Sequence, residues 1–165
     1  MNVLKKIFAP KSPAPVNAEE YYESGRSKAL SRDYRGAIDD LNKALILNGA
    51  HVNALLERGK ARAELKEFKG AIADYTKVIS LQPKNANAYQ KRAKAKNFLR
   101  DYTGAMHDLE MAVRLDPKFA IAYYERGMIS LVGLKDKKHA RIDFERAAEL
   151  GFMVANDALR QLYSE

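Results

Sequence analysis

The chain has 165 residues and a formal net charge of +8, from 29 Lys and Arg against 21 Asp and Glu. It contains no cysteine, which excludes disulfide bonds, thiolate nucleophiles and zinc–thiolate sites and is typical of a reducing compartment. No long run alternates in the manner of a strand, and no apolar run approaches the roughly 20 residues of a membrane-spanning helix. We therefore expect a helical, cytoplasmic protein whose positive charge favours an acidic partner.

Residues 1–17 differ in composition from the rest of the chain. They begin with a short amphipathic stretch, VLKKIF, and continue with Pro10, Pro13 and Pro15. Prolines at this density prevent a continuous helix and favour an extended, mobile tether. We expect residues 1–17 to be a flexible, basic, Pro-rich tail. Residues 1–8 would give only weak peripheral contact with a membrane surface, because one short apolar face with two lysines binds marginally.

The rest of the chain repeats itself at the constant spacing that separates Ala37 from Ala71 and Ala71 from Ala105. Five columns of similar residues keep this register through three consecutive copies, which indicates a protein built from one repeated supersecondary unit. The columns are Tyr34, Phe68 and Tyr102; Gly36, Gly70 and Gly104; Ala37, Ala71 and Ala105; Asp40, Asp74 and Asp108; and Leu47, Leu81 and Leu115.

Each copy contains two helical patterns separated by a short charged turn. Asp33 and Asp101 stand where a carboxylate can cap the second helix of a unit, and Pro83 and Pro117 stand where such a helix must end. A fourth copy carries one extra residue, which we place in its GLKDKKH turn. An amphipathic helix over residues 154–165 would then cap the last unit. The four units are expected at 18–51, 52–85, 86–119 and 120–153.

With these columns the chain resembles the tetratricopeptide repeat (TPR) family over residues 18–153. The resemblance implies an all-α protein, an α-solenoid of four TPR helix-turn-helix units plus a C-terminal capping helix. It also implies a non-enzymatic module that binds other proteins. The residues that carry it are Leu55, Gly59, Ala71, Tyr75, Val78 and Pro83 in the second unit and Tyr89, Ala93, Ala105, Leu109, Ala112 and Pro117 in the third.

Two charged columns are interpreted as structural. An Asp on the second helix of one unit is followed, always at the same spacing, by an Arg on the first helix of the next unit. Arg can bind a carboxylate with two hydrogen bonds, so these residues would join neighbouring units. Catalytic carboxylates would instead converge on one cleft, which a regular repetition does not favour. The predicted inter-repeat pairs are Asp40–Arg58, Asp74–Arg92 and Asp108–Arg126.

The resemblance also implies that the first helices line a concave, peptide-binding groove. The side chains on that face would offer cations, amides for backbone hydrogen bonds and two tyrosines as anchors, which suits an acidic peptide. The predicted groove residues are Tyr22, Arg26, Asn53, Leu56, Lys60, Asn87, Gln90, Lys91, Lys94, Asn97, Tyr124 and Met128.

Some TPR domains grip the C-terminal carboxylate of chaperones through Lys, Asn and Arg side chains. Neither window of three units in this chain reproduces that set, and Glu57 and Glu125 would repel a carboxylate there. We therefore expect an internal acidic segment of a partner rather than a chaperone tail.

Other classes of function have little support in the sequence. His51, His107 and His139 lack the spacing of metal ligands, and neither a phosphate-binding loop nor a nucleophile motif is present. We predict no enzymatic activity, no cofactor and no metal. One alternative is an adaptor tethered to a membrane surface by the N-terminal tail. A weaker alternative is a basic solenoid that associates with nucleic acid, which the lack of regularly interleaved aromatic residues disfavours.

Overall fold

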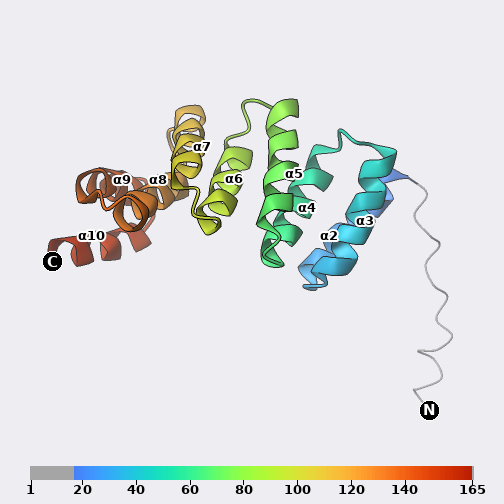
Figure 1. Cartoon of the computed structure of the whole chain (residues 1–165), viewed down its shortest axis with the longest axis horizontal. Coiled ribbons are helices and arrows are strands. Elements are labelled where there is room, and N and C mark those ends of the chain that lie inside the picture. Colours follow the sequence, from blue (N-terminus) through green and yellow to red (C-terminus); the bar gives the residue numbers. More distant parts are fainter. Residues whose placement is uncertain (1–16, 165) are drawn as a thin grey trace, which may run out of the picture.

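The computed structural model describes residues 17–164. This range is almost entirely helical (Figure 1). The helices are α2 (Ala18–Leu30), α3 (Tyr34–Leu47), α4 (Val52–Glu64), α5 (Phe68–Leu81), α6 (Ala86–Phe98), α7 (Tyr102–Leu115), α8 (Ala120–Met128), which continues into a π-helical segment (Ile129–Gly133), α9 (Lys137–Glu149) and α10 (Val154–Ser164).

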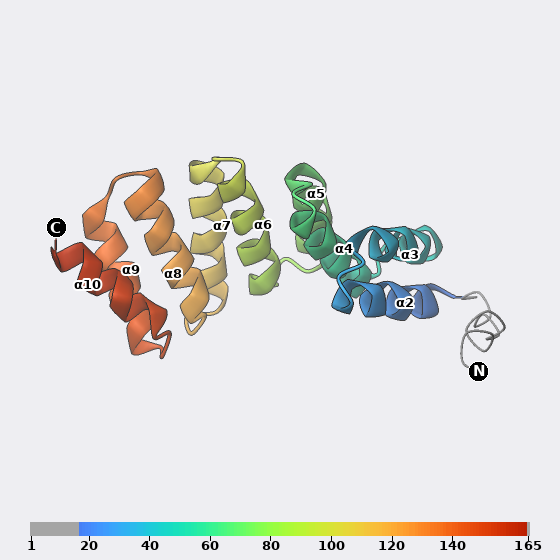
Figure 2. The same cartoon turned by 90° about the horizontal axis from the view of Figure 1, so that it is seen from below.

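Consecutive helices form antiparallel pairs, and the pairs stack into an elongated, twisted array (Figures 1 and 2). The pairs are α2–α3, α4–α5, α6–α7 and α8–α9, and α10 packs against α9 at the C-terminal end. This arrangement confirms the predicted all-α solenoid. The expected N-terminal tail, with its membrane contact through residues 1–8, lies outside the described residues except for Asn17, which caps α2.

Local sequence signals set the helix ends as predicted. The carboxylate of Asp33 accepts a hydrogen bond from the Gly36 amide at 3.0 Å, and that of Asp101 accepts one from Gly104 at 2.9 Å. Both contacts satisfy amides that have no partner within the helix. Helices α5 and α7 end two residues before Pro83 and Pro117, respectively.

Small residues midway along the first helices allow the two helices of a pair to approach closely. A Cβ atom added to Gly59 would lie 2.6 Å from the ring of Tyr75, and one added to Gly127 would lie 2.7 Å from the ring of Phe144. The bulky partner therefore comes from the second helix of the same repeat. Tyr75 and Phe144 are both buried, so one part of the core lies between the two helices of a repeat. The core also continues into the next repeat, since Leu41 of α3 belongs to one cluster with Ala54 of α4.

The extra residue of the fourth repeat lies in its first helix, and not in the turn where the sequence analysis placed it. The turns within the pairs are all equally short, including the one between Gly133 and Lys137. Helix α8 has 9 residues and its π-helical continuation adds 5 residues, whereas α2, α4 and α6 each have 13 residues. A π-bulge absorbs one added residue while the helix keeps its direction. The packing of Gly133 against the Tyr102 ring accompanies this local widening.

The buried Asp residues do not form the predicted pairs with the next repeat. Asp74 instead binds Arg58 and Arg62 of its own repeat, and Asp108 binds Arg92 and Lys96. Two residues equally distant from a tight turn face each other across an antiparallel helix pair, which explains why Asp74 lies opposite Arg58. The predictions of Asp40–Arg58, Asp74–Arg92 and Asp108–Arg126 as pairs are therefore wrong.

On α3, the residue that faces the next repeat is Asn42 and not Asp40. Arg58 donates a hydrogen bond to the Asn42 amide oxygen at 2.7 Å, and Arg92 donates one to the Thr76 hydroxyl at 3.1 Å. Two residues along a helix correspond to a rotation of about 200°, so Asp40 points back into its own repeat. These arginines thus link neighbouring repeats, but through neutral acceptors.

Candidate functional site

A cleft of about 580 Å³ opens between the first helices of three successive repeats, α4, α6 and α8. It contains five of the predicted groove residues, Lys60, Asn87, Gln90, Lys91 and Lys94. We call it the lysine cleft. Its lining consists of Lys60, Ala63, Glu64, Lys66, Phe68, Tyr75, Asn87, Gln90, Lys91, Lys94, Ala95, Phe98, Phe119, Ile121 and Glu125.

Three lysines from two helices give the cleft its positive charge. Burial lowers the pKa of Lys91, and the nearby Lys60 and Lys94 lower it further. Lys60 lies 3.6 Å from the carboxylate of Glu57 on its own helix. Within the described range, neither Lys91 nor Lys94 has a hydrogen bond or an ion pair through its ammonium group. Two cations that attract anions are therefore available to a ligand.

Glu125 places a negative charge in the same cleft. Its carboxylate accepts a hydrogen bond from the Gln90 side chain at 2.7 Å. Burial raises the pKa of Glu125, and the Gln90 hydrogen bond and the charges of Lys94 and Lys91 only partly oppose this effect. Gln90 itself is buried, so this hydrogen bond holds both side chains in fixed positions on the cleft wall. Glu125 reduces the net positive charge that an anionic ligand meets.

Aromatic and aliphatic side chains form the apolar part of the cleft. The rings of Phe68 and Phe98 stack with their centroids 4.7 Å apart and their planes 5° from parallel. Phe98 remains 59% exposed although it is large and apolar. Phe119 and Ile121, at the start of α8, complete this wall. An exposed aromatic ring fixed by a second ring is well suited to bind an apolar side chain.

A smaller cavity of about 120 Å³ continues the same surface toward the C-terminal ends of α6 and α8. It is lined in part by Lys94, Asn97 and Met128, which the sequence analysis assigned to the groove. Lys94 and Glu125 line both cavities, so the two form neighbouring parts of one surface.

The remaining predicted residues are not part of these cavities. Tyr22 packs on the His51 ring with centroids 4.9 Å apart, and Arg26 pairs with Glu23 at 3.4 Å. Asn53 is exposed, whereas Leu56 is half-buried against two clusters of the core. Tyr124 lies against Phe144 and Phe152, with centroid distances of 5.6 and 5.0 Å. Both tyrosines are half-buried, and their role as anchors stays a prediction.

Phe98, Ile121 and Glu125 are absent from the predicted groove residues. Glu125 follows Glu57 and Lys91 at the repeat spacing, and the sequence analysis considered it only as a residue that would repel a carboxylate on this face. Phe98 is the last residue of α6, a position that the repeat pattern marks as a helix end rather than as a binding residue. Only the stacking on Phe68 shows its orientation.

Two other cavities, of about 630 and 650 Å³, lie between second helices of adjacent repeats. The first is lined by His107, His139, Glu110 and Asp136 among others. No group of three or more His, Cys, Asp or Glu side chains in the described part of the chain is placed to hold a metal ion. None of the helices formed by residues 17–164 is long and apolar enough to cross a membrane.

Comparison with protein families gives two matches in the central repeats. A profile described as "TPR repeat" matches residues 59–96, and one described as "Tetratricopeptide repeat" matches residues 86–119. A comparison with curated protein sequences finds no match.

Several solved structures have the same fold. A crystal structure of MamA protein is 25% identical, covers 89% of this chain and 81% of its own, and has a TM-score of 0.81. The first TPR of Spaghetti (RPAP3), bound to the HSP90 peptide SRMEEVD, is 29% identical, with coverages of 68% and 90% and a TM-score of 0.65. A thermophilic TPR protein of Thermus thermophilus is 19% identical, with coverages of 88% and 81% and a TM-score of 0.72.

Proposed function

Because the chain belongs to the tetratricopeptide repeat family, whose members bind protein or peptide partners, it is a protein-interaction module, and we propose that it binds an acidic peptide segment of a partner in the lysine cleft. The observation that carries this proposal is the presence of Lys60, Lys91 and Lys94 beside an exposed apolar wall. The module acts as a scaffold in the cytoplasm and catalyses no reaction.

The positive part of the cleft selects the charge of the ligand. Lys91 is half-buried near two other lysines, an arrangement that destabilises its charged form until an anion enters. A carboxylate placed among the three ammonium groups relieves this repulsion and gains charge-assisted hydrogen bonds. An acidic side chain of the partner therefore provides the electrostatic part of the affinity.

The apolar and amide groups select the rest of the ligand. Phe98 and Ile121 are both exposed and can cover a leucine or aromatic side chain that follows the acidic residue. Asn87 is exposed on the same face and can bond to the backbone of an extended peptide. An acidic residue next to a large apolar residue is thus the expected motif.

The acidic peptide in the structure of the RPAP3 repeat supports this choice of ligand chemistry. In our protein, Glu125 lies in the cleft near Lys91 and Lys94. Its charge disfavours a free C-terminal carboxylate at this place, so we retain an internal segment as the ligand.

The test is an affinity capture from cell lysate at low and at high salt, followed by mass spectrometry. The bait is the full chain, and the test variant carries Lys60→Glu and Lys94→Glu. The control variant carries Lys84→Glu and Lys118→Glu, which change the net charge equally in loops outside the cleft. We expect the specific partners to be lost from the test variant and retained by the control. Partners retained unchanged by the test variant would exclude the lysine cleft as the binding site.

Two alternatives concern other surfaces of the chain. A membrane tether formed by residues 1–8 would lose its effect when residues 1–17 are deleted, which vesicle co-sedimentation measures. Association with nucleic acid would show a steep dependence on salt for any sequence. Phe98 is the only exposed aromatic ring lining the lysine cleft within the described residues, so a row of stacking rings is missing there.

A further inference from the structure

The turns within the four helix pairs share an unusual backbone conformation. Each contains a residue with a positive φ angle: Arg32 at 64°, Lys66 at 63°, Arg100 at 61° and Lys135 at 60°. In the described part of the chain these four are the only residues other than glycine with a positive φ. All four are basic.

A basic residue is a costly choice at this position. The left-handed conformation costs an L-residue about 1–2 kcal/mol, and glycine is the usual residue just after a helix end for that reason. The four side chains are exposed, and none has a hydrogen bond or ion pair within residues 17–164. Their charges therefore have no specific partner in the described part of the fold.

Some positions keep the same kind of residue in all four repeats, and the structure shows which of these residues the fold itself requires. The Asp at the position of Asp108 is kept in all repeats, and it is buried and paired. The acid at the position of Asp101 is also kept, and at three of the four turns its side chain caps the next helix. The column of Arg32, Lys66, Arg100 and Lys135 is the only one with a cation in every repeat. Since none of these four cations has a hydrogen-bonded or ion-paired partner among residues 17–164, all four are available to an external ligand.

Exposed leucines lie beside these cations. Leu30, Leu99 and Leu134 are 75%, 43% and 48% exposed, respectively, and each is within two residues of one of the four cations in the sequence. The opposite edge, formed by the loops between pairs, also exposes apolar side chains such as Ile46. The loops of that edge within 48–119, however, contain two lysines and no arginine. The combination of cation and leucine belongs to the first edge.

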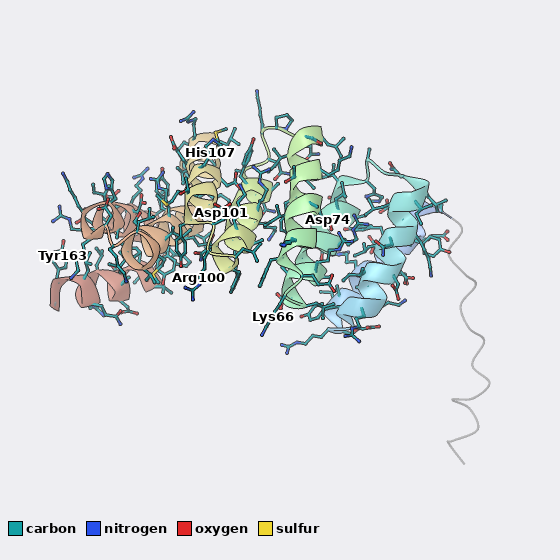
Figure 3. All side chains as sticks on the ribbon, viewed as in Figure 1. Lys66, Asp74, Arg100, Asp101, His107 and Tyr163 are labelled. Carbon is teal, nitrogen blue, oxygen red and sulfur yellow. The ribbon has the colours of Figure 1, made fainter. Side chains whose placement is uncertain are left out.

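The turns of the first three pairs lie along one side of the array. The joints between α2 and α3, α4 and α5, and α6 and α7 are all at the lower ends of the helices in Figure 1. Figure 3 shows Lys66 and Arg100 at this lower edge, away from the helix interfaces. Lys66 also lines the rim of the lysine cleft. The cations of the first three turns thus form a row on the outside of the solenoid.

We propose that this basic edge, defined by Arg32, Lys66, Arg100 and Lys135, docks on the surface of an anionic lipid bilayer. Lys and Arg next to exposed leucines match the two layers of such a surface, because the leucines enter the apolar boundary while the cations reach the anionic headgroups. A nucleic acid would favour aromatic rings between all the cations, whereas an exposed phenylalanine, Phe98, stands beside Arg100 alone and leucines are exposed at three of the turns. The surface is independent of the peptide ligand and of the N-terminal tail.

The experiment measures binding of the full chain to vesicles of phosphatidylserine and phosphatidylcholine, with vesicles of phosphatidylcholine alone as reference. The test variant carries Arg32→Gly, Lys66→Gly, Arg100→Gly and Lys135→Gly. Glycine removes the charge and relieves the strained conformation at the same time. We expect a higher melting temperature together with a loss of binding of about a thousandfold, because each of the four basic residues near such a surface contributes about 1 kcal/mol.

The control variant loses the same number of positive charges from the opposite edge and its vicinity, through Lys77→Ala, Lys84→Ala, Arg114→Ala and Lys118→Ala. It should keep most of the binding to anionic vesicles. Equal losses in the two variants would show that only net charge matters and would overturn the proposal. Absence of binding by the unmodified chain, or retention of binding by the glycine variant, would overturn it as well. So would tighter binding to single-stranded RNA that the glycine variant abolishes while vesicle binding persists.

Discussion

The charges inside the repeats and the charges in the lysine cleft follow opposite rules. Inside the repeats, Asp74 and Asp108 are buried and each binds two cations of its own first helix. In the cleft, Lys91 and Lys94 have no such partner among the described residues, and Glu125 is held by an amide. Charges of the first kind stabilise the fold, whereas charges of the second kind are available for binding.

Burial explains the difference between the two regions. A carboxylate that is removed from water must be neutralised by hydrogen-bonded cations, so the interior positions allow little variation. In unit one, however, Asp40 binds the Ser24 hydroxyl together with Lys28 and Lys43, two lysines that are 40% and 53% exposed. The interior pairs therefore differ in strength along the array, and substitutions can rank them.

The largest effect is expected for Asp108→Ala. The Asp108 side chain is 0% exposed, and its removal leaves Arg92 and Lys96 uncompensated at 15% and 19% exposure. Breaking such a pair from one side costs about 3–5 kcal/mol in the free energy of unfolding. Urea denaturation followed by circular dichroism measures it. Glu110→Ala, which removes an exposed carboxylate from the same helix, should stay within about 0.5 kcal/mol. Similar values for the two variants would contradict the assigned role of Asp108.

The interior network also shows how far the sequence predicts this structure. The repeat register predicts the helix pairs, the caps at Asp33 and Asp101, and the helix ends before proline, because each of these depends on neighbours along the chain. The partner of Asp74 was assigned wrongly, because Asp74 lies almost midway in the sequence between Arg58 and Arg92, and spacing alone does not show which of the two it faces.

The candidate site was only partly predictable for a similar reason. Lys60, Lys91 and Lys94 follow from the register of the first helices, which decides the face of each residue. Phe98 stands at a helix end, where a side chain has several directions open to it, and its stacking on Phe68 depends on tertiary packing. Tyr124 occupies the predicted register, but its ring also contacts Phe152, which comes from the segment before α10 and which spacing along the chain does not bring to it.

Asp40→Ala should destabilise the protein less than Asp108→Ala, by about 1–2 kcal/mol. Water can hydrate Lys28 and Lys43 after the change, because both are already substantially exposed. The hydroxyl of Ser24 also loses its acceptor, at a present distance of 2.7 Å. Denaturation under the same conditions as for Asp108→Ala provides the comparison. A cost for Asp40→Ala equal to or above that of Asp108→Ala would show that exposure of the cations does not decide the strength of the pair.

Glu125→Gln tests the negative charge in the cleft and should change stability by less than about 1 kcal/mol. Burial raises the pKa of Glu125, so the folded protein holds this proton at a higher pH than the unfolded chain does. The associated stability is present below the ordinary Glu pKa of about 4.3 and is lost as pH rises through the raised value. The Gln variant should not lose stability as pH rises through this range. Denaturation of both proteins at a series of pH values measures the difference.

The same substitution should strengthen binding of an acidic peptide at neutral pH by about fivefold, since a like charge near the ligand costs about 1 kcal/mol. For the unmodified protein, affinity should rise as pH falls through the raised pKa of Glu125, as long as the ordinary carboxylates of the peptide remain ionised. Fluorescence anisotropy with a labelled peptide measures both effects. A variant that keeps the pH dependence, or that binds more weakly, would show that Glu125 does not face the ligand.

Lys94→Gln is expected to leave stability unchanged within about 0.5 kcal/mol, the smallest effect of the series. Lys94 is exposed and, within the described part of the chain, its ammonium group has no hydrogen-bonded acceptor. Its removal therefore leaves no acceptor unsatisfied in the fold. Binding of the acidic peptide should nevertheless weaken by about fivefold and become less dependent on salt, because one attractive charge is removed. An effect on stability as large as that of Asp40→Ala would place Lys94 with the structural charges. An unchanged affinity would show that the peptide does not bind beside Lys94 in the lysine cleft.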